Sequence, residues 1–227
     1  VRRALSLAID RKRLTSDLLG QGQVPAFSFT PPIPGVYAPP EGTGYDPDTA
    51  RRLLAEAGYP DGNGFPPVQI LYNTIATDFH KHVAKVLQAM WKQELGIHLG
   101  LEIQEWKTYL KSIENREYDI ARAGWVGDFP DPGTFLDLFL QPDGNNNTGW
   151  THADYSKHVV NALSDKDQAS RMRSFYRAES VLMDELPVMP VFFYAFSMLK
   201  KPWIEGVYEN QQDIHPLRSV RIRRARK

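Results

Sequence analysis

The sequence contains no cysteine, and this absence removes several kinds of chemistry at once. Disulfide bonds, thiolate metal sites and cysteine nucleophiles are all excluded. An oxidising compartment is not excluded, because a chain of 227 residues can bury a core large enough to fold without covalent cross-links.

Long apolar runs and net charge are also missing. No apolar run reaches the length of about eighteen residues that a membrane-spanning helix needs. Lysine plus arginine and aspartate plus glutamate both number 27, so no overall field recruits nucleic acid or an anionic membrane. Only the last ten residues are one-sided, with six cations: Arg218, Arg221, Arg223, Arg224, Arg226 and Lys227. A solvated tail is the plain interpretation, and a tail that seeks phosphate or lipid is the alternative.

Signatures of metal and phosphate binding are absent as well. His80 and His82 are two residues apart, so on a helix they would point to different sides. The chain has no glycine-rich phosphate loop, nucleophile elbow or Walker motif. We therefore expect neither a metal site nor a cofactor.

Alternating strand and helix patterns predict an α/β fold. Residues 68–73 and 97–103 have the pattern of strands, and the amphipathic stretch 78–95 between them has that of a long helix. Such a unit is right-handed, with parallel strands, in nearly all proteins. A short helix over 106–115 then precedes a third strand that starts at Tyr118. Ligands of open α/β sheets gather at the carboxyl ends of strands, so we expect a site directly after this third strand.

Other stretches are predicted around this unit. Asp46–Pro47 supplies an N-cap and a first-turn proline, and Gly58 ends the helix that follows. Further helical patterns cover 1–10, 13–19, 133–139, 155–163 and 168–186. The prolines of 21–45 prevent a regular ladder, while its aromatic residues favour an ordered crossing over a flexible linker. Residues 187–194 have the pattern of a strand that 195–200 extends or returns.

The stretch 118–132 has the composition of a binding edge. Gly124 and Gly127 permit close approach because they lack a Cβ. Trp125 offers a rigid apolar wall, and Asp128 offers a fixed negative charge. These groups suit a ligand with an ammonium group and an extended peptide backbone, bound by strand addition.

A catalytic interpretation of the same stretch stays open. Asp128 and Asp131 are paired carboxylates, which are typical of general acid–base chemistry in hydrolases. The structural alternative is a turn before a helix, in which Asp131 is the N-cap ahead of Pro132.

Six ordered segments carry a resemblance to a known family. They are 1–11, 50–58, 71–74 with 78–81, 104–108, 118–128 and 201–203. Through them the chain resembles the C-terminal half of the extracytoplasmic solute-binding proteins of peptide ABC transporters, in particular the oligopeptide branch. The resemblance implies a periplasmic-binding-protein-like lobe, α/β with a mixed or parallel sheet flanked by helices, over 1–207. It implies a return segment toward an absent N-terminal lobe over 208–227. The opening on Val1 within a helical pattern also leads us to expect a piece of a longer protein.

The resemblance assigns main-chain and ammonium contacts to the stretch after the third strand. Asp128 matches the aspartate that pairs with a peptide α-ammonium group, and Gly124 and Val126 match residues whose main chain bonds to the ligand. Val126 stands where the family has a cysteine, which does not matter if only the main chain bonds. Ile113 stands where the family can have a carboxylate-binding arginine, so the preferred peptide length is left open.

Side-chain contacts are assigned in the same way. Trp125 and Trp106 match tryptophans that line side-chain pockets, and His80 and Arg122 match residues near the peptide's C-terminal carboxylate. For Arg122 the structural alternative is an ion pair with Asp119 or another acid. For His80 the alternative is a surface position at the start of a helix.

The implied function is that of a non-catalytic receptor. Its partners would be short peptides, the membrane permease of an ABC transporter and the missing N-terminal lobe, with no nucleic acid. Its place would be the periplasm, or outside the cytoplasmic membrane on a lipid anchor. A murein-peptide or nickel-complex receptor on the same fold and the hydrolase stay open. Because the opposite cleft wall belongs to the missing lobe, we expect Asp128 to be solvated and the isolated chain to bind peptides negligibly.

Overall fold

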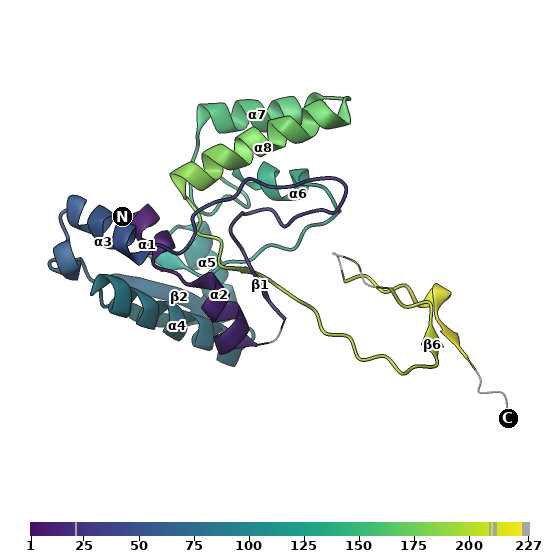
Figure 1. Ribbon diagram of the computed structural model, residues 1–227, viewed down its shortest axis with the longest axis horizontal. Helices are drawn as coiled ribbons and strands as arrows, with labels where there is room; N and C mark the ends of the chain where they lie inside the picture. Colours follow the sequence, from purple (N-terminus) through teal and green to yellow (C-terminus); the bar gives the residue numbers. More distant parts are fainter. Residues whose placement is uncertain (21, 209, 211–212, 224–227) are drawn as a thin grey trace.

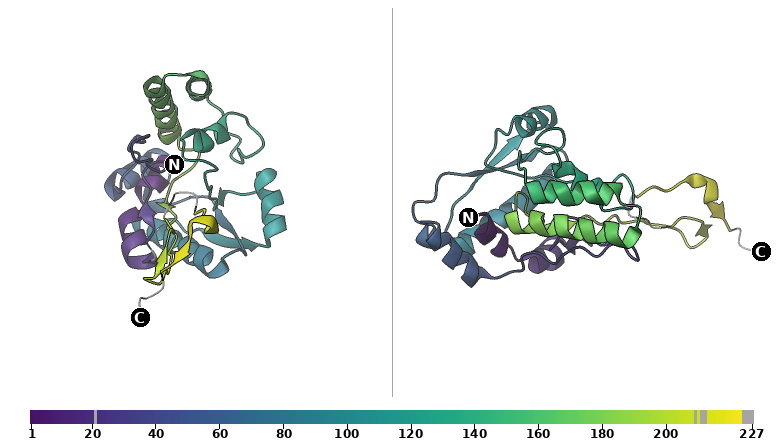
Figure 2. Two further views of the ribbon diagram at one scale, coloured as in Figure 1. Left: turned by 90° about the vertical axis from the view of Figure 1, so that its right-hand side faces the viewer. Right: turned by 90° about the horizontal axis from the view of Figure 1, so that it is seen from above.

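The computed structural model describes residues 1–20, 22–208, 210 and 213–223. Figure 1 shows a body of helices around a small sheet, a pair of long helices on one side, and a C-terminal arm that projects from the body. The right-hand view of Figure 2 shows the same arm from above. The body therefore holds the sheet and its edges, where the sequence places the candidate site.

The central sheet has three parallel strands in the order β3-β2-β4. They are β2 (Gln69–Asn73), β3 (Gly100–Gln104) and β4 (Ile120–Ala121). The predicted parallel strand–helix–strand unit is confirmed. The predicted strand over 97–103 begins only at Gly100, because Ile97 and Leu99 are buried in the core before the chain joins the sheet.

Helices cover both faces of this sheet. On one face lies α4 (Thr77–Leu95), which ends at Gly96 in the left-handed region with φ 70°. On the other face lies α5 (Trp106–Glu114). The alternation of β2 explains the two layers, because Ile70 joins the cluster under α4 and Leu71 joins a small cluster with α5.

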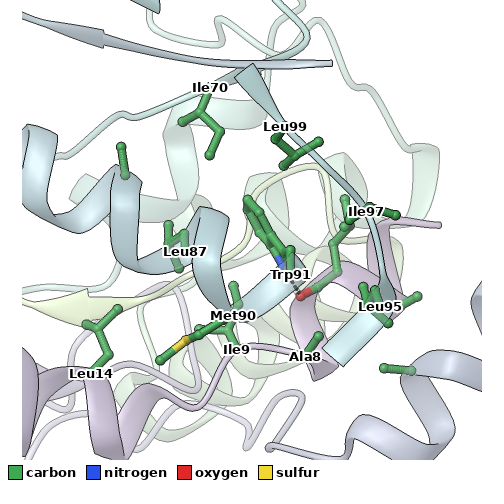
Figure 3. Close-up of a cluster of buried hydrophobic side chains, with 14 of the residues drawn as sticks. Ala8, Ile9, Leu14, Ile70, Leu87, Met90, Trp91, Leu95, Ile97 and Leu99 are labelled. Carbon is green, nitrogen blue, oxygen red and sulfur yellow. Dashed lines mark hydrogen bonds between the residues drawn. The ribbon is translucent and has the colours of Figure 1, made fainter. Parts of the chain in front are cut away.

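The main core centres on Trp91 of α4. Figure 3 shows its indole among side chains that include Ile70, Leu95 and Ile97. Trp91 is 1% exposed, and its Nε1–H donates to the Leu5 carbonyl at 2.8 Å. That bond joins α4 to the N-terminal helices, which are α1 (Arg2–Leu7), α2 (Arg11–Arg13) and the π-helical η1 (Leu14–Leu19).

Two predicted helix boundaries in the N-terminal part are confirmed, whereas the helix expected over 1–10 ends at Leu7. The helix α3 (Pro47–Glu56) begins at its aspartate N-cap, where the Asp46 side chain accepts a hydrogen bond from the Thr49 N–H at 3.0 Å. The helical turns of η1 end at Gly20, whose φ is 59°. Glycine adopts this left-handed conformation without the steric cost that a Cβ brings.

A second core lies between the long helix pair and the rest of the body. Its elements are α6 (Gly133–Leu136), the 3-10 turn η3 (Asp137–Phe139), α7 (Ala153–Ser164) and α8 (Gln168–Glu185). Tyr155, Phe175 and Leu182 are fully buried in it. The helices predicted from the sequence in this region are therefore present, with bounds that shift by one or two residues.

Residues 22–45, which we call the crossing segment, join the two cores. Its strand β1 (Val24–Pro25) pairs antiparallel with β5 (Phe192–Phe193). Thr30 and Tyr37 are buried, so the predicted ordered crossing is confirmed. The expected strand over 187–194 is wrong except for β5, since Pro187 and Pro190 lack the N–H that a ladder requires. Residue 21 lies outside the described residues.

The C-terminal arm begins after β5. Residues 195–200 form no strand, contrary to the expectation, and the Leu199 side chain is fully exposed. Farther on, β6 (Ile204–Glu205) pairs antiparallel with β7 (Arg221–Ile222). Short 3-10 turns lie at η2 (Pro60–Gly62) in the body and at η4 (Leu217–Ser219) in the arm. The last tail cations, Arg224, Arg226 and Lys227, lie outside the described residues.

Of the described helices, none has the length and apolar character needed to cross a bilayer.

We predict that Trp91→Phe lowers the free energy of unfolding by about 2 to 4 kcal/mol, because it leaves a gap in the core and the Leu5 carbonyl without its donor. Urea unfolding followed by circular dichroism measures the change. The matched control is Trp203→Phe, since Trp203 lies on the arm with half its surface exposed, and we expect a change within about 0.5 kcal/mol. Equal losses in the two variants would contradict the assignment of Trp91 to the core.

Candidate functional site

The candidate site begins where β4 leaves the sheet. The Arg122 N–H donates to the Leu71 carbonyl at 2.8 Å, which extends the pairing with β2 by one bond. The following residues run past the carboxyl edge of the sheet toward α6. The stretch thus lies directly after the third strand, and its role as a binding site stays a prediction.

Thr134 of α6 bonds to both residues that the sequence singles out, to the side chain of Trp125 and to the main chain of Asp128. The Trp125 Nε1–H donates to the Thr134 carbonyl at 2.8 Å, and the Asp128 N–H donates to the Thr134 hydroxyl at 3.0 Å. Thr134 is itself buried, so its position is set by the packing of α6. No sequence signal singled out Thr134, because its role depends on a contact between the loop and the next helix.

The two glycines of the stretch have different roles. A Cβ on Gly127 would lie 2.9 Å from the Phe135 ring, so glycine lets the main chain pack closely against α6 there. A Cβ on Gly124 would meet the Arg122 guanidinium at 3.4 Å and the Tyr194 ring at 3.6 Å, which are much milder contacts. Only Gly124 therefore fits the expectation of a backbone left open for a ligand.

The edge from Gly124 to Asp128 faces outward. Val126 is 60% exposed, Trp125 is 36% exposed, and Gly124 and Asp128 are also exposed. Within the described residues, no hydrogen bond engages the main chain of Gly124 or Val126. Two peptide units can therefore pair with an extended ligand, and Asp128 is exposed beside them.

A second carboxyl group adds negative potential beside Asp128. Burial raises the pKa of Asp137 above its ordinary value, and the negative charge of Asp128 raises it further. The charge effect places the two carboxyl groups within electrostatic reach of each other. Asp137 was missed by the sequence reasoning, because it belongs to the next helical turn and is nine residues away.

Asp131 is not available as the acid–base partner of Asp128. Its carboxylate accepts from both terminal nitrogens of Arg171, one of them at 2.7 Å, and from the Gly133 N–H at 2.8 Å. Burial alone would raise the pKa of Asp131, but the bonds from Arg171 and Gly133 outweigh it and hold that pKa below its usual range. The predicted N-cap role is close, since the helix begins one residue later with Pro132 as its N-cap. Asp131 thus serves the fold.

Arg122 lies against Tyr194 at the carboxyl edge of the sheet. Its guanidinium donates to the Tyr194 hydroxyl and lies 5.8 Å from the centre of that ring. The alternative ion pair between Arg122 and Asp119, both of which the structure describes, is not formed. Asp119 instead accepts a hydrogen bond from the Gln69 N–H at 3.0 Å. Tyr194 follows β5 directly, so it reaches Arg122 only through the tertiary fold.

His80 is buried rather than on the surface. It is 5% exposed, and within the described residues its Nδ1 has no hydrogen-bond partner. Burial lowers the pKa of His80 to about 4, with the positive charge of Arg122 as the second cause, while a bond to the Asn73 backbone opposes both. His80 is therefore neutral at pH 7, so it can give a ligand a hydrogen bond but no charge.

Trp106 reaches the same edge from α5. Its ring is 37% exposed and stacks on Tyr109 with centroids 5.7 Å apart. The Tyr109 hydroxyl donates to the Arg122 carbonyl, so the stacked pair supports the first residue after β4. Trp106 thus contacts the candidate edge indirectly, through the side chain of Tyr109.

The candidate residues form an open wall. Two concavities of the chain lie elsewhere, one between the N-terminal arginines and the end of α8, and one beside Leu71, Glu102 and Tyr118. An exposed wall of this kind needs a second surface opposite it before it can enclose a small ligand.

Comparison with known proteins identifies the family. Residues 1–147 match the family described as bacterial extracellular solute-binding proteins, family 5 middle. The chain belongs to this family. The periplasmic murein peptide-binding protein MppA of Escherichia coli is 34% identical over 98% of this chain and 42% of its own length. The oligopeptide-binding protein OppA of Bacillus subtilis is 33% identical over 91% of this chain and 39% of its own.

Solved structures agree with this assignment. The unliganded open form of the murein tripeptide binding protein MppA has a TM-score of 0.86 at 33% identity, covering 98% of this chain and 44% of that chain. Haemophilus influenzae OppA in complex with RPPGFSPFR has a TM-score of 0.82 at 33% identity, covering 99% and 45%. The predicted α/β fold of the periplasmic-binding-protein type is confirmed. The chain spans about two fifths of the length of the relatives it matches.

We predict that His80 titrates near pH 4, far below its ordinary pKa of 6.5. In Arg122→Met the pKa of His80 rises, because one positive neighbour is lost, but it stays below 6.5 because burial persists. Nuclear magnetic resonance of the imidazole C–H signals measures both values. Lys81→Met is the matched control, since this exposed cation follows His80 in the chain and should leave its titration unchanged. Titration near 6.5 in the unmodified chain would overturn the assignment.

Proposed function

We propose that this chain is one peptide-binding lobe of an extracytoplasmic receptor of an ABC importer, periplasmic or lipid-anchored. The carrying observation is the exposed edge on which the main-chain groups of Gly124 and Val126 stand beside the Asp128 carboxylate. A short peptide lies along this edge as an added strand, so its backbone is recognised whatever its side chains are. The receptor then delivers its ligand to the membrane permease.

In this proposal, the N-terminus of the peptide lies at Asp128. An α-ammonium group there forms an ion pair with Asp128 and gains from the negative potential of Asp137. The bond from the Asp128 N–H to the Thr134 hydroxyl holds the main chain at this position. Trp125, held by the same threonine, forms an apolar wall for a neighbouring ligand side chain, and Trp106 forms another.

The peptide's C-terminal carboxylate is placed toward Arg122. Arg122 supplies the positive charge, and neutral His80 supplies at most a hydrogen bond. Ile113 cannot contribute, because it is buried against Leu71 and carries no charge. One cation rather than two is therefore assigned to this end of the ligand.

A second lobe completes the site in this proposal. An ion pair at 4 Å is worth about 1 kcal/mol in water and roughly 4 kcal/mol at an effective dielectric constant near 20, so Asp128 needs water to be excluded. The C-terminal arm supports this part of the proposal. It exposes apolar side chains that a second lobe packed against the arm would bury: Phe196, Leu199, Trp203, Leu217 and Ile222.

A murein peptide is the second candidate ligand. The similarity to MppA, 34% over 98% of this chain, favours it as much as the similarity to the OppA proteins favours ordinary oligopeptides. Thermal-shift measurements of the complete receptor with alanine tripeptide and with murein tripeptide separate the two. A hydrolase has no such support, because Asp131 is bonded to Arg171.

We predict that Asp128→Asn in the complete receptor weakens binding of alanine tripeptide about tenfold to a hundredfold, because the charge-assisted bond to the ammonium group is lost. Isothermal titration calorimetry measures the affinity. The same substitution should have little effect on N-acetylated alanine tripeptide, which has no ammonium group.

Asp154→Asn is the matched control, since this aspartate is exposed on α7 and is not one of the residues of the edge. Equal weakening for the free and acetylated peptides would show that Asp128 does not bind the ammonium group.

We also predict that the 227-residue chain alone binds alanine tripeptide negligibly, whereas the complete receptor binds it. The reason is that the Asp128 carboxylate stays in water when the opposite wall is missing. Calorimetry of both proteins with the same peptide decides the matter. Submillimolar binding by the chain alone would contradict the need for a second lobe.

A further inference from the structure

Glu179 is a fully buried acid within α8, and it is not one of the residues of the proposed peptide edge. Its side chain is 0% exposed. Its Oε1 accepts from the Thr30 N–H and its Oε2 accepts from the Tyr37 hydroxyl, both at 2.8 Å. Both donors belong to the crossing segment, so one carboxyl group ties this segment to the long helix pair.

No positive charge compensates this carboxyl group. Within the described residues, no lysine, arginine or histidine forms an ion pair with Glu179. The titratable groups that face it are Tyr37 of the crossing segment and Tyr155 of α7, and burial raises the pKa of each above its ordinary value. Both phenols therefore stay neutral. An ionised Glu179 would be a buried charge supported by hydrogen bonds alone, which is costly.

The protonation of Glu179 is set by two opposing effects. Burial raises the pKa of Glu179 from 4.5 to about 7, while the bonds from Thr30 and Tyr37 lower it in part. In an opened state that admits water, the carboxyl group regains its ordinary pKa. Opening therefore releases a proton, and it becomes easier as the pH rises from about 4.5 to about 7.

The crossing segment is the element that would move. It has only a two-residue strand and one isolated bridge, between Ile33 and Tyr37, as regular structure. The helix α8, in contrast, is anchored in the second core along its length, with Phe175 and Leu182 fully buried. Water reaches Glu179 at the lowest cost by displacement of the less regular partner.

We propose that Glu179 is a proton-controlled pin, which holds the crossing segment against α8 as a neutral acid and lets this segment open when it ionises. Opening of the crossing segment would also affect Arg122. The strand β1 of this segment pairs with β5. Tyr194 directly follows β5, and its hydroxyl accepts a hydrogen bond from Arg122. An opened crossing segment thus loosens the support of Arg122. This inference does not depend on which ligand the edge binds.

Hydrogen exchange of the 227-residue chain, read by mass spectrometry on peptides that cover 28–37, tests the pin. After correction for intrinsic exchange, we expect the opening constant to rise about sixtyfold between pH 5 and pH 7.5. In Glu179→Gln, which keeps an acceptor for Thr30 and a polar partner for Tyr37 but does not titrate, the rise should vanish. Protonation of His80 favours opening at acidic pH, which is the opposite pH dependence. This contribution is the same in the unmodified chain and in Glu179→Gln, so it cancels when the two are compared.

Two further variants define the outcome. Glu185→Gln, an exposed acid at the end of the same helix, should behave like the unmodified chain. Should Glu179→Gln fail to fold, Tyr37→Phe replaces it. Loss of the Tyr37 bond raises the pKa of Glu179 further, so the rise should extend to higher pH. A pH-independent opening constant in the unmodified chain, or an equal rise in Glu179→Gln, would overturn the proposal.

Discussion

The bond from the Arg122 N–H to the Leu71 carbonyl marks the end of the central sheet, and the candidate site depends on that end point. Up to this bond the main chain of β4 is committed to β2. Beyond it, the peptide groups of Gly124 and Val126 have no partner in the described part of the chain. A longer β4 would use these groups inside the sheet, and a shorter one would leave Arg122 without a fixed position. The length of one short strand thus decides which residues form the exposed edge.

Local signals in the sequence predicted the framework well. The aspartate and proline at Asp46–Pro47 and the left-handed residue Gly96 define helix ends through backbone geometry, which depends on neighbours in sequence. The period of the apolar residues predicted the parallel unit for the same reason. The strand expected over 187–194 failed, because apolar composition cannot tell a ladder from an extended segment that packs without one.

The candidate site was only partly predictable. Asp128, Trp125 and Gly124 were found because they lie together in one stretch of sequence. Thr134 and Tyr194 were not, since each acts through a contact that only the folded chain makes. His80 shows the same limit. Its spacing suggested a surface residue as readily as a ligand contact, whereas its burial and its neutral imidazole follow from the way α4 packs against the sheet edge.

The charges at the edge have a polarity that follows from the fold. One end carries the carboxyl groups of Asp128 and Asp137, and the other carries Arg122, with a histidine that burial keeps neutral. A histidine with its ordinary pKa would add a second, pH-dependent cation beside Arg122. Burial of His80 therefore leaves the positive end of the wall to a single guanidinium, whose placement depends on Tyr194 and on the strand pair beneath it. The two ends of this edge thus depend on different parts of the fold, since Arg122 contacts Tyr194 beside the β1–β5 pair and the main chain of Asp128 is bonded to Thr134 of α6.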